Sequence, residues 1–200
     1  MLNGSATLPR EMRVLAQLRR LPPSVAVFQW RARRLARRVG DEFALASGTR
    51  PGNLALLLRV ANGRRRIVEL GTGSAWTAAS LVLADRGCEV VTYDPIERSE
   101  RDLYLSLVGS EAQRRLRLVR ASGEQGPSDS RMVDLLYVDS SHDREETIRE
   151  VQAWRPTLAE GSLIVFDDFV HPEYPGVQEA VQRLGLAGEQ RGNLFIHRVS

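Results

Sequence analysis

Short apolar runs alternate with longer stretches of helical periodicity, and this alternation constrains the fold more than any other feature of the sequence. The runs are Ile67 to Leu70, Glu89 to Tyr93, Leu116 to Val119, Val133 to Val138 and Leu163 to Phe166. Strands that alternate with helices imply right-handed crossovers and a parallel sheet that is covered on both faces. We therefore expect an α/β fold with a doubly wound, mostly parallel, Rossmann-like sheet.

Helix signals flank these runs. The periodicity predicts helices over residues 10–20 and 25–39, separated by a pair of prolines, and a shorter one over Asn53 to Ala61. Asp143 and Glu146 have the spacing of a capping box, and a last helix begins near Pro175 before a final strand. We expect residues 1–48 to form an N-terminal helical cap and residues 49–200 to form the binding domain.

Composition excludes several classes of protein. The chain has no stretch apolar enough to span a membrane, and its first residues lack the apolar core of a signal peptide, so we expect a cytoplasmic location. Its single cysteine, Cys88, excludes an internal disulfide framework and a metal site built from cysteines.

All 28 basic residues are arginines, and five of them gather on the helix predicted over residues 25–39. These are Arg31, Arg33, Arg34, Arg37 and Arg38. Apolar residues share the opposite side of that helix, which predicts a solvated arginine face on a packed helix. A surface for a partner, an anionic substrate or a nucleic acid remains the alternative.

Four of the predicted strands end in polar residues. The endings read VELGTGSAWT, VVTYDP, LLYVDSSH and LIVFDDF. In open α/β sheets, ligands bind outside the carboxyl ends of the strands, so these endings are expected to meet a ligand. Gly71 and Gly73 form a turn between strand and helix, and Asp94 follows about 20 residues later, where a carboxylate can accept the hydroxyls of a ribose.

The first ending resembles the cofactor motif of class I S-adenosylmethionine-dependent methyltransferases. Glu69, Gly71 and Gly73 match that motif, whereas Ala75 stands in place of its third glycine. The resemblance implies that S-adenosylmethionine is the cofactor and that Thr77 binds its carboxylate. It also implies that Asp94 and Asp139 contact the cofactor and that Ser122 lies where the adenine is read.

The segment from Val133 to Phe169 resembles the catechol and caffeoyl-CoA O-methyltransferases and the related macrolide-sugar and aminocoumarin enzymes. Asp139 and His142 keep the Asp-x-x-His turn of that group, with Ser140 in place of a glycine, and a paired Asp follows the fifth strand. The resemblance covers roughly residues 49–181. It implies methylation of a small-molecule hydroxyl, with the acceptor pocket shaped by the N-terminal helices, and it makes a homodimer a further expectation.

The same resemblance implies that Asp139, Asp167 and Asp168 hold Mg²⁺. Three oxygen ligands at neighbouring strand ends suit such a hard cation, which would neutralise the adjacent carboxylates. In the alternative without a metal, Asp167 accepts hydrogen bonds from backbone N–H groups of the next loop and Asp168 is solvated.

Methyl transfer to a hydroxyl also needs a proton acceptor. His142 and His171 are the candidate catalytic bases, although His142 could instead fix its turn or contact the cofactor. Two other functions stay open. One is methylation of a nucleic acid that binds the arginine helix, against which no base-methylation motif is found. The other is a non-catalytic domain that only binds S-adenosylmethionine.

Overall fold

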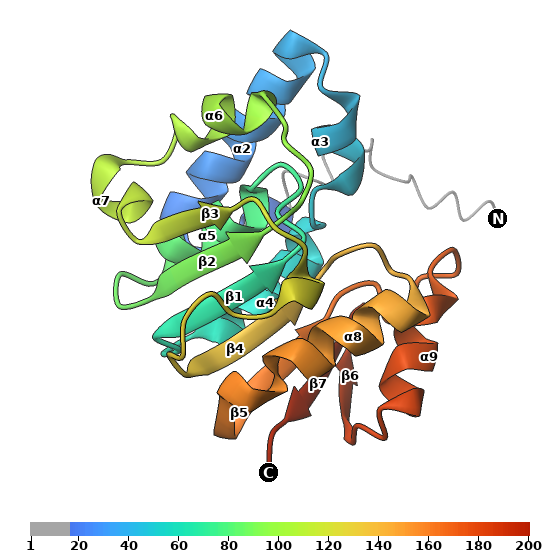
Figure 1. Cartoon of the computed structure of the whole chain (residues 1–200). Coiled ribbons are helices and arrows are strands. Elements are labelled where there is room, and N and C mark those ends of the chain that lie inside the picture. The colour runs from blue at the N-terminus through green and yellow to red at the C-terminus, as the bar shows by residue number, and fades with distance from the viewer. Residues whose placement is uncertain (1–16) are drawn as a thin grey trace, which may run out of the picture.

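The computed structural model describes residues 17–200 (Figure 1). Its strands are β1 (Arg66–Leu70), β2 (Glu89–Tyr93), β3 (Leu116–Val119), β4 (Val133–Val138), β5 (Leu158–Phe166), β6 (Gly188–Arg191) and β7 (Leu194–Arg198). The α-helices are α2 (Pro23–Val39), α3 (Glu42–Ser47), α4 (Pro51–Ala61), α5 (Trp76–Ala84), α6 (Glu100–Leu105), α7 (Ser110–Gln113), α8 (Arg144–Trp154) and α9 (Pro175–Arg183). Two 3₁₀ turns, η1 (Gly123–Gln125) and η2 (Arg155–Thr157), follow β3 and α8.

The strands form one sheet in the order β3-β2-β1-β4-β5-β7-β6. Strands β1 to β5 are parallel, whereas β7 runs antiparallel to both β5 and β6. The chain therefore winds from β1 outward to β3 and then returns to β4 on the other side of β1. The predicted doubly wound, mostly parallel sheet is confirmed, and the switch point between β1 and β4 is where such sheets bind ligands.

Helices cover both faces of the sheet (Figure 1). Alternate residues of each strand point to opposite faces, and each face has its own apolar core. Ile67 and Leu135 pack with α2, α4 and α5, whereas Val68 and Leu136 pack with α8 and α9. Strands buried on both faces explain why the runs read from the sequence are continuously apolar.

Helix α2 belongs to the first of these cores, because Val25, Phe28 and Ala32 are buried there. The expected arginine face is exposed at four of its five arginines, and Arg33 is the exception. Arg33 is half-buried, and its guanidinium carbon lies 5.2 Å from the centre of the Trp76 ring. The helix predicted over residues 10–20 lies mostly outside the described residues.

The sequence prediction missed elements that bury little apolar surface. Strand β6 is polar and exposed along its whole length, and helices α3, α6 and α7 are too short to show a clear periodicity. Strand β5 begins five residues before the apolar run at Leu163, in a segment that contains Gly161. Among residues 17–200, no helix is both long and apolar enough to cross a membrane.

Candidate active site

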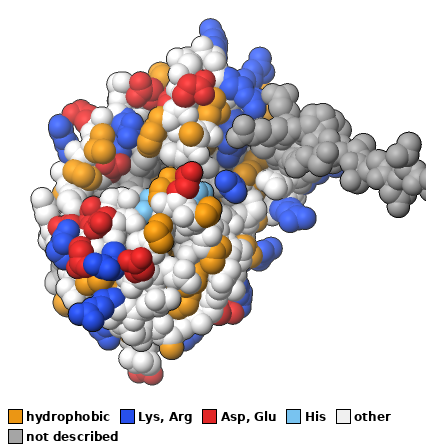
Figure 2. All heavy atoms as spheres, turned by 90° about the vertical axis from the view of Figure 1, so that its right-hand side faces the viewer, with side chains coloured by type: hydrophobic (Ala, Val, Ile, Leu, Met, Phe, Trp, Pro, Cys, Tyr) orange, Lys and Arg blue, Asp and Glu red, His pale blue; other side chains and the backbone are white. Residues whose placement is uncertain are grey.

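A cavity of about 450 Å³ opens at the carboxyl ends of the parallel strands. The turn after β1, the residues after β2 and β4, and the acidic pair after β5 line its floor. Phe43 and residues 46–50 of the N-terminal segment form its opposite wall. Figure 2 looks onto this side of the molecule, where histidine side chains are visible beside a hollow. Its volume lies in the range of sites for small molecules, about 300–1,000 Å³.

The glycine turn after β1 depends on a close approach between two backbones. Gly71 has φ +97°, and a Cβ atom at this position would lie 1.9 Å from the carbonyl oxygen of Asp139. Only glycine fits there. Ala75, which replaces the third glycine of the motif, has φ +64° and is therefore a left-handed residue with a side chain. The turn thus keeps the glycine-type conformation even where the sequence departs from the motif.

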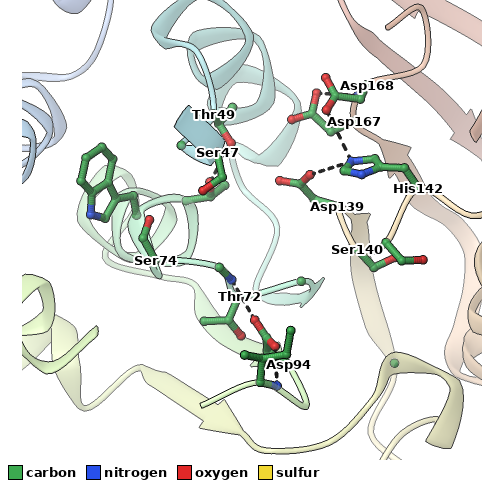
Figure 3. A pocket seen from close by; sticks show the side chains of 18 of the residues that line it. Ser47, Thr49, Thr72, Ser74, Asp94, Asp139, Ser140, His142, Asp167 and Asp168 are labelled. Atoms are coloured by element: carbon green, nitrogen blue, oxygen red, sulfur yellow. Dashed lines mark hydrogen bonds and ion pairs between the residues drawn. The ribbon is translucent and has the colours of Figure 1, made fainter. Parts of the chain in front are cut away.

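Asp94 fixes this turn from the end of β2. Its Oδ2 accepts hydrogen bonds from the backbone N–H of Gly73 at 3.0 Å and from the Arg101 guanidinium, and its Oδ1 accepts from the N–H of Ile96 at 2.8 Å. Arg101 also donates from Nε to the carbonyl oxygen of Gly73 at 2.7 Å. The carboxylate and the turn are therefore held as one unit at the cavity wall (Figure 3).

Glu69, the acidic residue of the motif, lies beneath the turn and does not line the cavity. It is buried, and its Oε2 accepts a hydrogen bond from the hydroxyl of Thr92, which in turn bonds that of Thr72 at 2.7 Å. Burial raises the pKa of Glu69 from its ordinary 4.5 to about 8, against the opposing effect of the Thr92 hydrogen bond. Its place supports a structural role for Glu69 in holding the turn.

Asp139, His142 and Asp168 converge at the other end of the cavity (Figure 3). Nε2 of His142 lies 3.5 Å from Oδ1 of Asp139 and 3.4 Å from Oδ2 of Asp168. One atom from each of the three side chains lies within 4.8 Å of the others, which is a spacing suited to a shared cation. Burial raises the pKa of Asp139, while the neighbouring His142 lowers it in part.

Asp167 lies behind this cluster and also lines the cavity. Its Oδ2 accepts a hydrogen bond from the Tyr137 hydroxyl at 2.7 Å, and its Oδ1 accepts from the backbone N–H of Asp168 at 2.8 Å. Burial, followed by repulsion from Asp139, raises the pKa of Asp167 to about 7. The backbone contact expected in the metal-free alternative is therefore present, but Asp168 is held by the Asn193 amide rather than freely solvated.

The two candidate bases flank one tyrosine. The Tyr174 ring stacks on His142, with ring centres 4.2 Å apart, and on His171, with centres 4.6 Å apart. Burial alone would lower the pKa of His142, but the hydrogen bond and charge of Asp139, with the charge of Asp168, raise it overall. Nδ1 of His171 accepts from the N–H of Glu173 at 3.3 Å.

The structure brings most of the predicted site residues to this one cavity. Its lining includes Gly71, Gly73, Thr77, Asp94, Ser122, Asp139, His142, Asp167, Asp168 and His171. The Thr77 hydroxyl lies 2.9 Å from that of Thr49, at the junction with the N-terminal segment. Arg101, Tyr174 and Glu150 were missed, because each lies within a helix or loop whose local sequence carries no motif.

Sheet order, glycine turn and the carboxylate after β2 together define the class I methyltransferase fold. A protein family described as a methyltransferase domain matches residues 68–169, just over half of the chain. The chain belongs to this methyltransferase family, and it is an S-adenosylmethionine-dependent enzyme. No curated protein sequence matches it.

Solved structures share this fold at low sequence identity. A methyltransferase from Geobacter sulfurreducens is 17% identical, with a TM-score of 0.66, over 94% of this chain and 97% of that one. The O-methyltransferase from Bacillus cereus in complex with SAH is 14% identical, with a TM-score of 0.63, over 98% and 94%. CalS11, a TDP-rhamnose 3'-O-methyltransferase of calicheamicin biosynthesis, is 16% identical, with a TM-score of 0.61, over 96% and 95%.

Glu69 is expected to make stability fall as pH rises. Because its pKa is raised to about 8 in the folded protein, its contribution is complete below the ordinary pKa of 4.5 and is lost as pH rises through 8. Each unit of pKa difference corresponds to about 1.4 kcal/mol. Glu69→Gln should therefore flatten the dependence of the free energy of unfolding on pH between about pH 5 and pH 8.

Urea denaturation at several pH values measures this dependence. Glu89→Gln is the matched control, because Glu89 is a partly exposed strand residue whose pKa is lowered by its hydrogen bond with Arg131. A Glu69→Gln profile as steep as that of the wild type would show that Glu69 ionises freely in the folded protein.

Proposed function

We propose that this enzyme transfers the methyl group of S-adenosylmethionine to a hydroxyl group of a small-molecule acceptor. The observation that carries the proposal is the cavity itself, which joins a glycine turn and Asp94 to a cluster of carboxylates and histidines. The first group of residues suits a nucleoside cofactor. The second suits a hydroxyl that must lose its proton as it is methylated.

For the cofactor, the proposal assigns a role to each part of the turn. The backbone N–H groups after Gly71 face the amino-acid portion, and the paired hydroxyls of Thr49 and Thr77 are within reach of its carboxylate. Asp94 accepts a ribose hydroxyl with the lone pairs left by its three protein donors. Ser122 lies on the cavity wall assigned to the adenine.

A divalent cation fits the acidic end of the cavity. Asp139 and Asp168, with Asp167 behind them, would hold it, and their oxygens are the donors that Mg²⁺ prefers. When bound, such an ion lowers the pKa of a hydroxyl that it contacts. Two of these carboxyl groups have raised pKa values because burial disfavours their charge, and a cation offsets that cost.

For the proton, we assign the role of base to His142. Its ring lines the cavity beside the acidic cluster, with Nε2 3.5 Å from Oδ1 of Asp139 and 3.4 Å from Oδ2 of Asp168. Asp139 orients the His142 ring through this contact, and the Tyr174 ring stacks on the face of the imidazole. His171 lines the cavity from the loop after β5, where it is suited to contact the acceptor.

The partial cover over the cavity supports a small acceptor rather than a nucleic acid. Phe43 and residues 46–50 cover the side opposite the sheet, and the guanidinium carbon of Arg98 lies 3.5 Å from the centre of the Phe43 ring. We propose phenols, catechols and sugars as the acceptor class, in keeping with the O-methyltransferases that share the fold.

Removal of the metal should lower methyl transfer. With a panel of phenols, catechols and nucleotide sugars, we expect EDTA to reduce the rate at least about tenfold and Mg²⁺ to restore it. Asp168→Asn should raise the Mg²⁺ concentration needed for half-maximal rate, whereas Glu97→Gln, at an exposed carboxylate, should not. An unchanged rate in EDTA would exclude a metal from the reaction. Cofactor binding without transfer to any acceptor would support a non-catalytic domain.

Loss of the base should affect turnover more than binding. His142→Asn is expected to lower kcat by about 100-fold or more, since general base catalysis contributes factors of this order. The KM for S-adenosylmethionine should stay within a few-fold of the wild type. His171→Asn is the matched variant, and it should change the KM for the acceptor more than kcat. If His171→Asn lowered kcat more than His142→Asn did, the role of base would be assigned to His171.

A further inference from the structure

A second buried carboxyl group lies in the cavity wall, away from the acidic cluster. Glu150 belongs to the second turn of α8, is 1% exposed, and contributes to the lining of the cavity. Neither the proposed metal site nor the proposed base uses it. A carboxyl group buried on a helix that otherwise packs against the sheet calls for a partner, because burial without hydrogen bonds is costly.

The space for this carboxyl group comes from a glycine on another element. A Cβ atom at Gly123 in η1 would lie 2.5 Å from Oε1 of Glu150, so a side chain at this position would displace the carboxyl group. The Trp154 indole, one turn further along α8, donates to the carbonyl oxygen of Gly123 at 2.8 Å. This hydrogen bond joins helix α8 to η1, and the Glu150 carboxyl group occupies the space that a side chain at position 123 would fill.

Ser140 orients the carboxyl group. Its hydroxyl donates to Oε2 of Glu150 at 2.7 Å, from the position where the Asp-x-x-His turn of the resembling enzymes has a glycine. Oε1 has no hydrogen-bond donor among residues 17–200. Ser140 and Gly123 therefore both accommodate the same carboxyl group, and one of its oxygens is left available to a ligand.

The proposed orientation of the cofactor places its adenine against the part of the cavity wall that contains Glu150. Asp94 receives the ribose, and the methyl group must face the acceptor at the cluster of Asp139 and Asp168. The adenine then extends the other way, toward Ser122 and Gly123, where the exposed Ile96 side chain offers an apolar surface for its ring. This placement of the adenine rests on the proposed function.

We propose that Glu150 determines the specificity for adenine by accepting a hydrogen bond from its 6-amino group at Oε1. An amino group supplies the donor that this oxygen lacks, whereas a 6-oxo base would present a second acceptor to it. Burial raises the pKa of Glu150 to about 7, and a new donor at Oε1 favours the ionised form. Sites built to pair with one polar group reject analogues that leave it unpaired.

Calorimetric titration with two ligands tests this assignment. The ligands are S-adenosylhomocysteine and its 6-oxo analogue S-inosylhomocysteine. For the wild type we expect a preference for the adenosine ligand of about tenfold or more, the effect of one unmade buried hydrogen bond. Glu150→Gln should reduce or reverse the ratio, because its amide can donate to the 6-oxo group.

Two further variants separate recognition from general damage to the site. Thr77→Val, at the amino-acid end of the cavity, should weaken both ligands equally and keep the ratio. Gly123→Ala displaces the Glu150 carboxyl group and should lower the ratio, with thermal melting as the check on folding. A Glu150→Gln variant that binds S-adenosylhomocysteine with an unchanged ratio would overturn the role of Glu150 alone. A wild type that binds neither ligand would overturn the cofactor site as well.

Discussion

The site depends on the close contact between the backbone of Gly71 and the carbonyl oxygen of Asp139. A Cβ atom at Gly71 would come within 1.9 Å of that oxygen, so the turn after β1 can reach the end of β4 only without a side chain. Because β1 and β4 are neighbours at the switch point of the sheet, this contact joins the two halves of the cavity. The glycine turn lines one part of the cavity, and Asp139 begins the acidic cluster that lines the other.

Crowded carboxyl groups are the electrostatic consequence of this arrangement. Each has a different compensating group: Glu69 has Thr92, Asp94 has Arg101, Glu150 has Ser140, and Asp167 has the Tyr137 hydroxyl. Glu69, Glu150 and Asp167 still have raised pKa values because burial outweighs their hydrogen bonds. Buried acids that are poised to change charge near neutral pH are typical of ligand and catalytic sites.

The sheet and much of the site could be predicted because both impose local patterns on the sequence. Strands buried on two faces must be apolar, and residues that end them must meet the ligand, so Asp94, Asp139 and Asp168 could be placed from position alone. Strand β6 buries nothing and leaves no trace of this kind. Glu150 reaches the cavity, and Arg101 reaches the glycine turn, from helices α8 and α6, and only the packing of these helices against distant segments brings them there. Glu69 is bonded to Thr92 of the neighbouring strand and lies under the turn, outside the cavity lining.

The measurement that tests this account most directly is calorimetric titration of the full chain with S-adenosylmethionine, beside an Asp94→Ala variant. The account predicts binding at a single site in the wild type and at least about tenfold weaker binding in the variant, since the ribose loses a buried charged acceptor and the turn loses its anchor. Equal affinities would contradict the placement of the ribose at Asp94. Absence of binding by a folded wild type would contradict the cofactor site as a whole.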